Sequence, residues 1–145
     1  MEILCDTRQK KGKHLNIERY CSEHNITMIP YCLSVGDYML KGGNIAVDTK
    51  QSIVETANDL YADKKSFNKK YKKCYKQNIK LYVLIEEKVK DLRCWTSKVT
   101  KISGRFLLEL MHDLEISYGV CFVFCDKQDT GKILIDLLKG SDKNG

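Results

Sequence analysis

Apolar residues occur in short runs along the chain, and each run has the length and composition of a β-strand. The runs are rich in Ile, Val, Leu, Tyr and Phe, which pack well on a pleated sheet. Two of them, residues 80–87 (KLYVLIEE) and 119–126 (GVCFVFCD), are almost continuously apolar, which is typical of buried strands. Two glycines, at 42 and 43, predict a hairpin turn. Strands are expected at residues 2–5, 26–31, 37–40, 44–50, 80–87 and 119–126.

Apolar residues at helical spacing mark the segments between these strands. Ile17, Tyr20, Cys21 and His24 fall at positions i, i+3, i+4 and i+7 and would share one helix face. Helices are expected within residues 14–25, 51–61, 63–77, 103–118 and 130–140. Strands that alternate with helices, without internal repeats or a linker, predict one α/β domain over residues 1–145, with a mixed central sheet flanked by helices.

The third of these helices carries an excess of positive charge. Residues 64–76 (KKSFNKKYKKCYK) contain seven lysines and no acidic residue, in a chain of formal net charge +6. Phe67, Tyr71 and Cys74 form an apolar stripe along this helix. The lysines opposite the stripe are Lys65, Lys69, Lys72 and Lys76. Such a cluster is typical of a surface that binds a polyanion such as DNA, although a solvated helix face has the same pattern.

The composition excludes several classes of protein. No run of about eighteen apolar residues is present, so we expect no membrane-spanning helix. The seven cysteines include no CxxC pair and the three histidines are scattered, which argues against a structural zinc site and a disulfide framework. The N-terminal MEILCDTR lacks the features of a signal peptide. We therefore expect an intracellular protein, in the cytoplasm of a bacterium or a virus-infected cell, or in a eukaryotic nucleus.

The predicted hairpin concentrates residues that can bind a divalent cation. Asp48 and Lys50 are two residues apart in one strand and would point to the same side. The hairpin can bring Asp37 near Asp48, and two close carboxylates repel each other unless a cation lies between them. Oxygen ligands favour Mg²⁺ or Mn²⁺, and a lysine beside the metal can orient a phosphate or a water. This set of groups suits phosphodiester hydrolysis, although an exposed ion pair and an ordinary turn would explain the same spacing.

The order of these features resembles the nuclease domain of the XPF family of structure-specific endonucleases, within the PD-(D/E)XK superfamily. That domain opens with a strand ending in D-x-R, continues through a helix to GDY or GDF, and returns through a hairpin to E-R-K. The matching stretches here are residues 6–8 (DTR), 36–38 (GDY) and 48–50 (DTK). The resemblance runs from residue 2 to 138 and implies a restriction-endonuclease-like fold.

The resemblance also implies an activity, with three departures from the family pattern. Asp48 stands where the family usually has Glu, Thr49 where it has Arg, and Gln9 where it often has an acid. The superfamily accepts Asp at the first position, so the implied protein is a Mg²⁺- or Mn²⁺-dependent endonuclease acting on branched, flap or junction DNA in repair or recombination. A catalytically inactive DNA-binding subunit of the same fold is the alternative, because the family pairs active with inactive partners. A scaffold for nucleic-acid mimicry or host interaction ranks third.

The central residues of the site then take specific roles. Asp37 and Asp48 are expected to bind the metal, with the backbone carbonyl of Thr49 as a third ligand. Lys50 would position or activate the water and stabilise the charge that develops on the phosphate.

Each outer residue has a functional and a purely structural interpretation. Asp6 would be a supporting ligand, or hold Lys50, or simply end its strand. Arg8 would bind a phosphate or lie in a solvated loop, and Glu55 would hold a water or a second metal or be an ordinary first-turn acid. The lysines expected to contact DNA are Lys10, Lys11, Lys13, Lys65, Lys69, Lys72 and Lys76. Family members pair through the surface that corresponds to helix 103–118 and the last helix, so the implied assembly is a homodimer or a pair with a related subunit.

Overall fold

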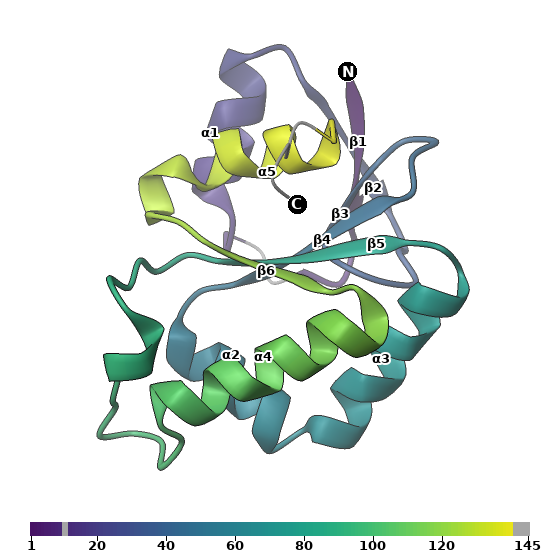
Figure 1. Cartoon of the computed structure of the whole chain (residues 1–145). Helices are drawn as coiled ribbons and strands as arrows, with labels where there is room; N and C mark the ends of the chain where they lie inside the picture. Colours follow the sequence, from purple (N-terminus) through teal and green to yellow (C-terminus); the bar gives the residue numbers. More distant parts are fainter. Residues whose placement is uncertain (10–11, 141–145) are drawn as a thin grey trace.

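In the described part of the chain, six strands form one mixed β-sheet with helices on both faces (Figure 1). The computed structural model describes residues 1–9 and 12–140, so the predicted DNA contacts Lys10 and Lys11 lie outside the described residues. The strands are β1 (Glu2–Asp6), β2 (Thr27–Tyr31), β3 (Tyr38–Leu40), β4 (Ile45–Lys50), β5 (Lys80–Ile85) and β6 (Cys121–Phe124). Their order is β2-β1-β3-β4-β5-β6, with β3 antiparallel to both of its neighbours and the other pairs parallel. The predicted mixed sheet is confirmed.

The helices cover the two faces of the sheet in separate layers (Figure 1). One layer holds α1 (Leu15–Glu23) and α5 (Thr130–Leu138), and the other holds α2 (Ile53–Tyr61), α3 (Lys64–Lys76) and α4 (Gly104–Tyr118). Short 3-10 helices follow β5 and β6, as η1 (Leu92–Cys94) and η2 (Lys127–Asp129). Each strand and α-helix differs from its predicted range by at most two residues at either end. None of the described helices is long and apolar enough to cross a membrane.

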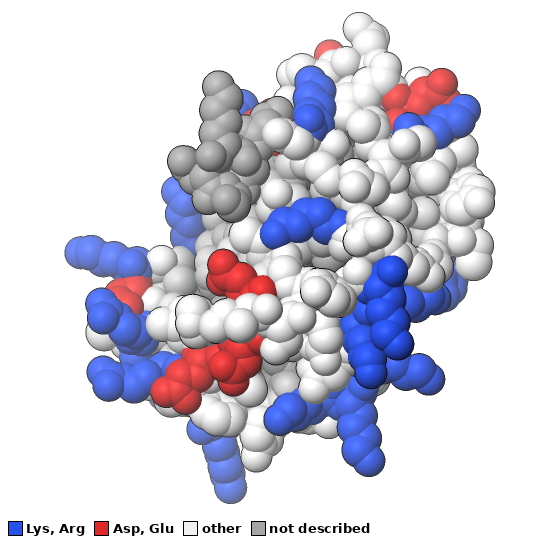
Figure 2. Space-filling view, turned by 45° about the vertical axis from the view of Figure 1, so that its right-hand side comes forward, with Lys and Arg blue, Asp and Glu red and all other residues white. Residues whose placement is uncertain are grey.

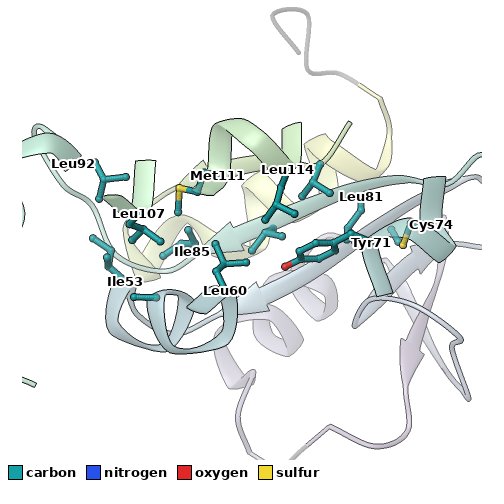
Figure 3. Packing of buried hydrophobic residues seen from close by; sticks show 14 of the residues in the cluster. Ile53, Leu60, Tyr71, Cys74, Leu81, Ile85, Leu92, Leu107, Met111 and Leu114 are labelled. Atoms are coloured by element: carbon teal, nitrogen blue, oxygen red, sulfur yellow. The ribbon is translucent and has the colours of Figure 1, made fainter. Parts of the chain in front are cut away.

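The larger core lies between the sheet and the layer of α2, α3 and α4 (Figure 3). The predicted stripe of α3 supplies buried Tyr71 and Cys74, and α4 supplies Leu107, Met111 and Leu114 at helical spacing. Burial of each leucine and methionine side chain of this kind contributes about 1.5–3 kcal/mol. The amphipathic spacing of these two helices therefore determines which of their faces meets the sheet.

The smaller core lies between the opposite face of the sheet and helices α1 and α5. Ile17 and Cys21 are buried there, as their spacing predicts. His24, which the same spacing places on this face, is instead exposed, because α1 ends at Glu23 and His24 is its C-cap. β6 is half-buried rather than buried, because it is an edge strand that pairs only with β5 among the described strands.

The predicted hairpin is formed by β3 and β4 at the centre of the sheet. Tyr38 pairs with Val47 and Met39 with Ala46, and Gly42 in the turn has a φ of +77°. Both faces of β4 are covered, since Ala46 belongs to the larger core and Val47 to the smaller one. Polar side chains at the end of β4 are therefore held between two layers of helices.

Candidate active site

The Gly36-Asp37 dipeptide lies where the chain enters β3, beside β4. Gly36 has a φ of +73°, a conformation that residues with a side chain rarely adopt. A Cβ at this position would lie 3.1 Å from the Cβ of Ala46 and 3.2 Å from the carbonyl oxygen of Val47. The close approach allows the backbone N–H of Asp37 to donate to the carbonyl of Val47 at 2.8 Å. Glycine at position 36 is therefore what brings the carboxyl group of Asp37 up to β4.

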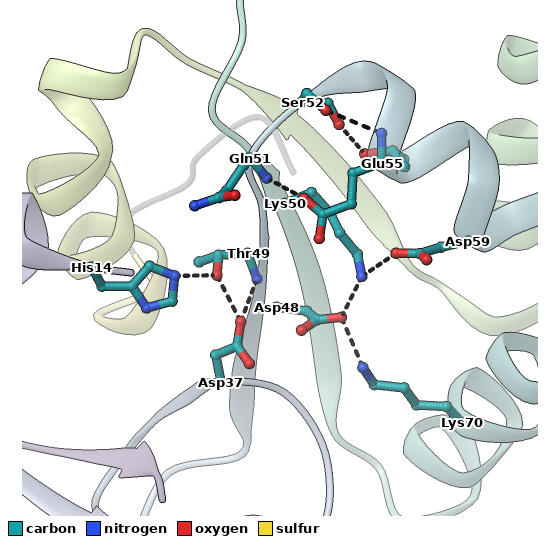
Figure 4. Close-up of polar contacts among 11 residues, drawn as sticks. His14, Asp37, Asp48, Thr49, Lys50, Gln51, Ser52, Glu55, Asp59 and Lys70 are labelled. Atoms are coloured by element: carbon teal, nitrogen blue, oxygen red, sulfur yellow. Dashed lines mark hydrogen bonds and ion pairs between the residues drawn. The ribbon is translucent and has the colours of Figure 1, made fainter. Parts of the chain in front are cut away.

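Uncharged groups hold the carboxyl group of Asp37 (Figure 4). Thr49 donates to Oδ2 of Asp37 twice, from its backbone N–H at 2.9 Å and from its hydroxyl at 2.6 Å. His14 is buried beside them, with Nε2 2.9 Å from the Thr49 hydroxyl and Nδ1 2.5 Å from the hydroxyl of Tyr38. Burial, helped by the charge of Lys13, lowers the pKa of His14 to about 4, so the ring is neutral at pH 7.

Two ammonium groups hold the carboxyl group of Asp48, which projects from β4 toward α2 and α3 (Figure 4). Nζ of Lys70, from α3, lies 2.8 Å from Oδ2 of Asp48, and Nζ of Lys50 lies 3.8 Å from the same atom. Lys50 also forms an ion pair with Asp59 of α2 at 2.6 Å. Both ammonium groups lie over the ring of Phe67, at 4.7 Å for Lys50 and 5.4 Å for Lys70. The expectation that Asp48 and Lys50 point to the same side of the strand is confirmed.

The two carboxyl groups differ in their affinity for protons. Burial and the negative charge of Asp48 raise the pKa of Asp37, and the hydrogen bonds from Thr49 only partly oppose this. Burial alone would also raise the pKa of Asp48, but the charges of Lys70 and Lys50 outweigh it and lower that pKa. The two carboxyl groups therefore interact directly, and Asp37 is the one that takes up a proton first.

Lys50 is a buried ammonium ion. Its burial alone would lower its pKa, but the negative charges of Asp48, Asp59 and Glu55 together raise the pKa above its ordinary value. An ammonium group has three donors and no acceptor. At neutral pH, Lys50 can therefore donate to a phosphate oxygen or a water, but it cannot take a proton from water.

Asp6 and Arg8 pair with each other at the end of β1. Nε of Arg8 lies 3.2 Å from Oδ2 of Asp6, and the guanidinium group also donates to the carbonyl of Leu33. The backbone N–H of Leu33 donates in turn to Oδ1 of Asp6 at 3.2 Å. Asp6 thus holds Arg8 and the loop before β3. The expectation that it holds Lys50 is wrong, because the acidic partners of Lys50 among the described residues are Asp48 and Asp59.

Glu55 lies in the first turn of α2, whose N-cap is Ser52. Its carboxylate accepts from the backbone N–H of Gln51 at 2.8 Å, while the hydroxyl of Ser52 accepts from the N–H of Glu55 at 3.1 Å. The bond to Ser52 satisfies an N–H group that the helix start leaves unpaired, and the bond from Gln51 ties the carboxylate to the residue before the N-cap. Glu55 therefore makes structural contacts in the first turn of the helix, and its role toward a water or a second metal stays a prediction.

An open cleft of about 510 Å³ gives access to Asp37, and we call it the site cleft. It is lined by Asp6, Arg8, Gln9, Gly12, Lys13, Asp37, Gln51 and Glu55. Four outer residues that the sequence assigned to the site or to DNA contact, namely Asp6, Arg8, Lys13 and Glu55, therefore surround Asp37.

A second open groove, of about 550 Å³, runs along α3, and we call it the lysine groove. Its lining residues are Ser34, Ser66, Lys69, Lys70, Lys72, Lys73, Lys76 and Gln77. Lys69, Lys72 and Lys76 were expected to contact DNA, and Lys65 is exposed on the same helix outside the groove. Figure 2, which brings the α3 side of the molecule forward, shows several Lys and Arg side chains close together at its lower right, with no acidic side chain visible among them.

The groups around Asp37 and Asp48 fit a cation of the Mg²⁺ type. Among the described residues, no three His, Cys, Asp or Glu side chains form a complete metal cage. Mg²⁺ does not need one, because it commonly uses one or two carboxylates, water and the phosphates of a substrate. The N–H of Thr49 points to Asp37, and in an extended strand the carbonyl of the same residue points to the same edge. The carbonyl oxygen of Thr49 is thus directed toward Asp37, where it could serve as a third oxygen ligand.

Three residues of this arrangement were not predicted from the sequence, namely His14, Asp59 and Lys70. Lys70 had a signal, since it stands at a position of the apolar stripe of α3, where a lysine requires a partner. The sequence signal for Asp59 was weaker, since this residue follows Glu55 by four positions and shares its helix face. His14 had none, because its partner Thr49 is distant in the sequence.

Comparisons with known proteins agree with this architecture. No protein-family model and no curated protein sequence matches the chain significantly. Among solved structures, the chain is similar to XPF from Aeropyrum pernix, with a TM-score of 0.74 and 18% identity over 99% of this chain. XPF from Aeropyrum pernix in complex with DNA gives a TM-score of 0.74 and 19% identity over 98% of this chain. The chain covers 66% and 65% of these two structures, slightly less than two thirds. The predicted XPF-type, restriction-endonuclease-like fold is therefore confirmed.

Proposed function

We propose that the protein is a metal-dependent endonuclease that hydrolyses phosphodiester bonds in DNA. The observation that carries this proposal is the convergence of Asp37, Asp48 and Lys50 at the end of β4. Two interacting carboxyl groups lie together there, with an ammonium group 3.8 Å from one of them. The XPF-like fold around these residues supports the same function.

In this proposal Asp37, Asp48 and the carbonyl of Thr49 hold Mg²⁺ or Mn²⁺. The bound cation supplies a water of lowered pKa and positive charge beside the scissile phosphate. The hydrogen bonds from Thr49 keep the carboxyl group of Asp37 oriented before any ligand arrives, and His14 supports the Thr49 hydroxyl from behind. Ligands that are held in place in this way cost little reorganisation at the moment of reaction.

Lys50 donates to the phosphate or to the attacking water and stabilises the negative charge that develops during hydrolysis. Its raised pKa keeps it charged for this role, which excludes it as a general base. Asp59 holds the ammonium group from α2 at 2.6 Å, so the side chain is positioned from two sides.

The lysine groove and the site cleft bind the DNA backbone in this proposal. Lysines neutralise phosphates without reading bases, and Arg8 and Lys13 at the site cleft extend the same contact. One of the structures with a similar fold is XPF in complex with DNA. Because contacts of this kind read no sequence, and because the chain resembles structure-specific endonucleases, we propose branched, flap or junction DNA as the substrate.

Cleavage of labelled junction, flap and plain duplex DNA in Mg²⁺ or Mn²⁺ tests the proposal, with RNA of the same sequence in parallel. We expect cutting of a branched substrate that EDTA stops and that Asp37→Ala and Lys50→Ala abolish. Lys88→Ala is the matched control, because its ion pair with Asp126 lies outside the site. Binding without cutting, unchanged by the two site substitutions, would refute the enzyme and support the inactive DNA-binding subunit. Preferential cutting of RNA would correct the substrate.

We also propose that a second copy of the chain pairs along β6 and α4. An apolar groove of about 480 Å³ lies there, lined by Leu108, Met111, Phe122 and Phe124 among others, at the open edge of the sheet. Ile116, on the same helix, is 71% exposed. Sedimentation velocity should show a dimer that Leu108→Glu converts to a monomer, and a monomeric parent protein at micromolar concentration would contradict the pairing.

A further inference from the structure

Lys70 belongs to two sites at once. Its ammonium group lies 2.8 Å from Oδ2 of Asp48, one of the two proposed metal ligands, and the same side chain lines the lysine groove. Figure 4 shows it reaching from α3 to Asp48 from the side opposite to Lys50. A divalent cation bound by Asp48 and the ammonium group of Lys70 would therefore compete for the same carboxylate.

Lys70 is the lysine that can leave, and Lys50 is the one that stays. Lys50 has a second carboxylate partner, Asp59 at 2.6 Å, and its side chain is 9% exposed. Lys70 is 30% exposed and, in the described part of the chain, its ion pairing is to Asp48 alone. Both ammonium groups also lie over one aromatic ring, that of Phe67, so their like charges repel each other at close range.

The charge balance of the site favours the same displacement. The charged groups that act on one another here are Asp37, Asp48, Glu55 and Asp59, with four negative charges when ionised, and Lys13, Lys50 and Lys70, with three positive ones. A divalent cation added to this group leaves it with one excess positive charge, whereas departure of Lys70 restores neutrality. A phosphate in the lysine groove offers the departing ammonium group a new partner.

We propose that Lys70 is a displaceable counter-ion that couples DNA binding in the lysine groove to metal binding at Asp48. This inference rests on the proposed function. Without DNA, Lys70 neutralises Asp48 and weakens the affinity for the cation. DNA phosphates draw Lys70 away, so the cation binds tightly only when a substrate is present. Because such coupling is reciprocal, the cation must strengthen DNA binding by the same factor.

Calorimetric titration of Mn²⁺ into the metal-free protein tests this, with and without a short phosphorothioate duplex that resists cleavage. For the parent protein we expect the duplex to tighten Mn²⁺ binding by about tenfold, within the range typical of coupled sites. Lys70→Met keeps the length of the side chain over Phe67 but removes its charge. It should bind Mn²⁺ about tenfold more tightly than the parent protein without DNA, and the duplex should add little. Lys70→Arg keeps the charge and should retain the coupling.

Lys64→Met, on the same helix, is the control for the loss of one positive charge, because Lys64 lies outside the lysine groove and forms no ion pair among the described residues. It should leave Mn²⁺ binding as in the parent protein. Parent-like or weaker Mn²⁺ binding by Lys70→Met, or equal tightening by Lys64→Met, overturns the coupling while leaving the nuclease proposal intact. Absence of Mn²⁺ binding in all variants, with or without DNA, overturns both.

Discussion

The two carboxyl groups of the candidate site are held in opposite ways. Asp37, on the side of α1, accepts hydrogen bonds from the uncharged N–H and hydroxyl of Thr49. Asp48, on the side of α2 and α3, is held by the ammonium groups of Lys50 and Lys70. The physical consequence appears in their proton affinities, since the pKa of Asp37 is raised and that of Asp48 is lowered.

This difference in partners determines which contacts of the two carboxyl groups can remain when a cation binds. A hydroxyl or a backbone N–H does not repel a positive ion, so the hydrogen bonds to Asp37 are compatible with metal binding. An ammonium group does repel it, so at least one of the two ion pairs of Asp48 must lengthen. One carboxylate is therefore prepared for the metal in advance, and the other is stabilised by charges that the metal must displace.

The largest expected effect comes from replacing the two carboxyl groups one at a time, in the metal-free protein at pH 7. Asp48→Asn leaves Lys70 without its carboxylate partner and Lys50 with Asp59 alone, and should lower the free energy of unfolding by about 3 kcal/mol. Asp37→Asn should leave it unchanged or raise it, because a group whose native pKa is raised destabilises the fold once ionised. Urea unfolding in EDTA measures both values, and equal losses would remove the contrast between the two residues.

A smaller effect is expected from the hydroxyl that holds Asp37. Thr49→Val keeps the shape of the side chain but removes the donor, and should cost about 1–2 kcal/mol of stability. If Asp37 binds the metal, cleavage should also fall by about 10- to 100-fold. Thr49→Ser restores the hydroxyl and should recover most of both. A serine variant as poor as the valine variant would show that packing, and not the hydrogen bond, matters here.

The neutral histidine behind Thr49 should make stability depend on pH. The unfolded chain protonates His14 near its ordinary pKa of 6.5, whereas the native protein does so only near 4. Stability is therefore lost as the pH falls below about 6.5 toward 4, because the unfolded state binds the proton more readily. Between pH 7 and 5, the parent protein should lose on the order of 1 kcal/mol more than His14→Gln. Identical pH profiles of urea unfolding in EDTA would show that folding does not lower the pKa of His14.

The smallest expected effect is on the salt dependence of DNA binding, which should differ between lysines of the lysine groove and other lysines on α3. Lys72→Ala removes a lining residue of the lysine groove, and should reduce the slope of log affinity for DNA against log salt concentration by about 0.9. Lys65→Ala, exposed on the same helix outside the groove, should change the slope less. Fluorescence anisotropy at several salt concentrations measures the slopes. A larger change for Lys65→Ala would place the DNA contact elsewhere on the helix.

Much of the candidate site was predictable because it depends on local spacing. The alternation of residues in a strand puts Asp48 and Lys50 on one side of β4, and the glycine turn returns the chain so that Asp37 lies beside them. The metal itself, the DNA and the pairing of two copies stay predictions. Asp6 and Glu55 show the limit of spacing, since each has a local partner, Arg8 or Gln51, that the sequence motif did not indicate.

By itself, the sequence determined the elements, their order and the buried faces of helices such as α3, because these follow from periodicities within a few residues. Only the tertiary structure decided the partners of the carboxyl groups. His14 reaches Thr49 across 35 positions of the chain, and Lys70 reaches Asp48 across 22. Contacts between such distant residues depend on how the two helical layers pack against β4. Local sequence patterns span only a few residues, so they do not specify these contacts.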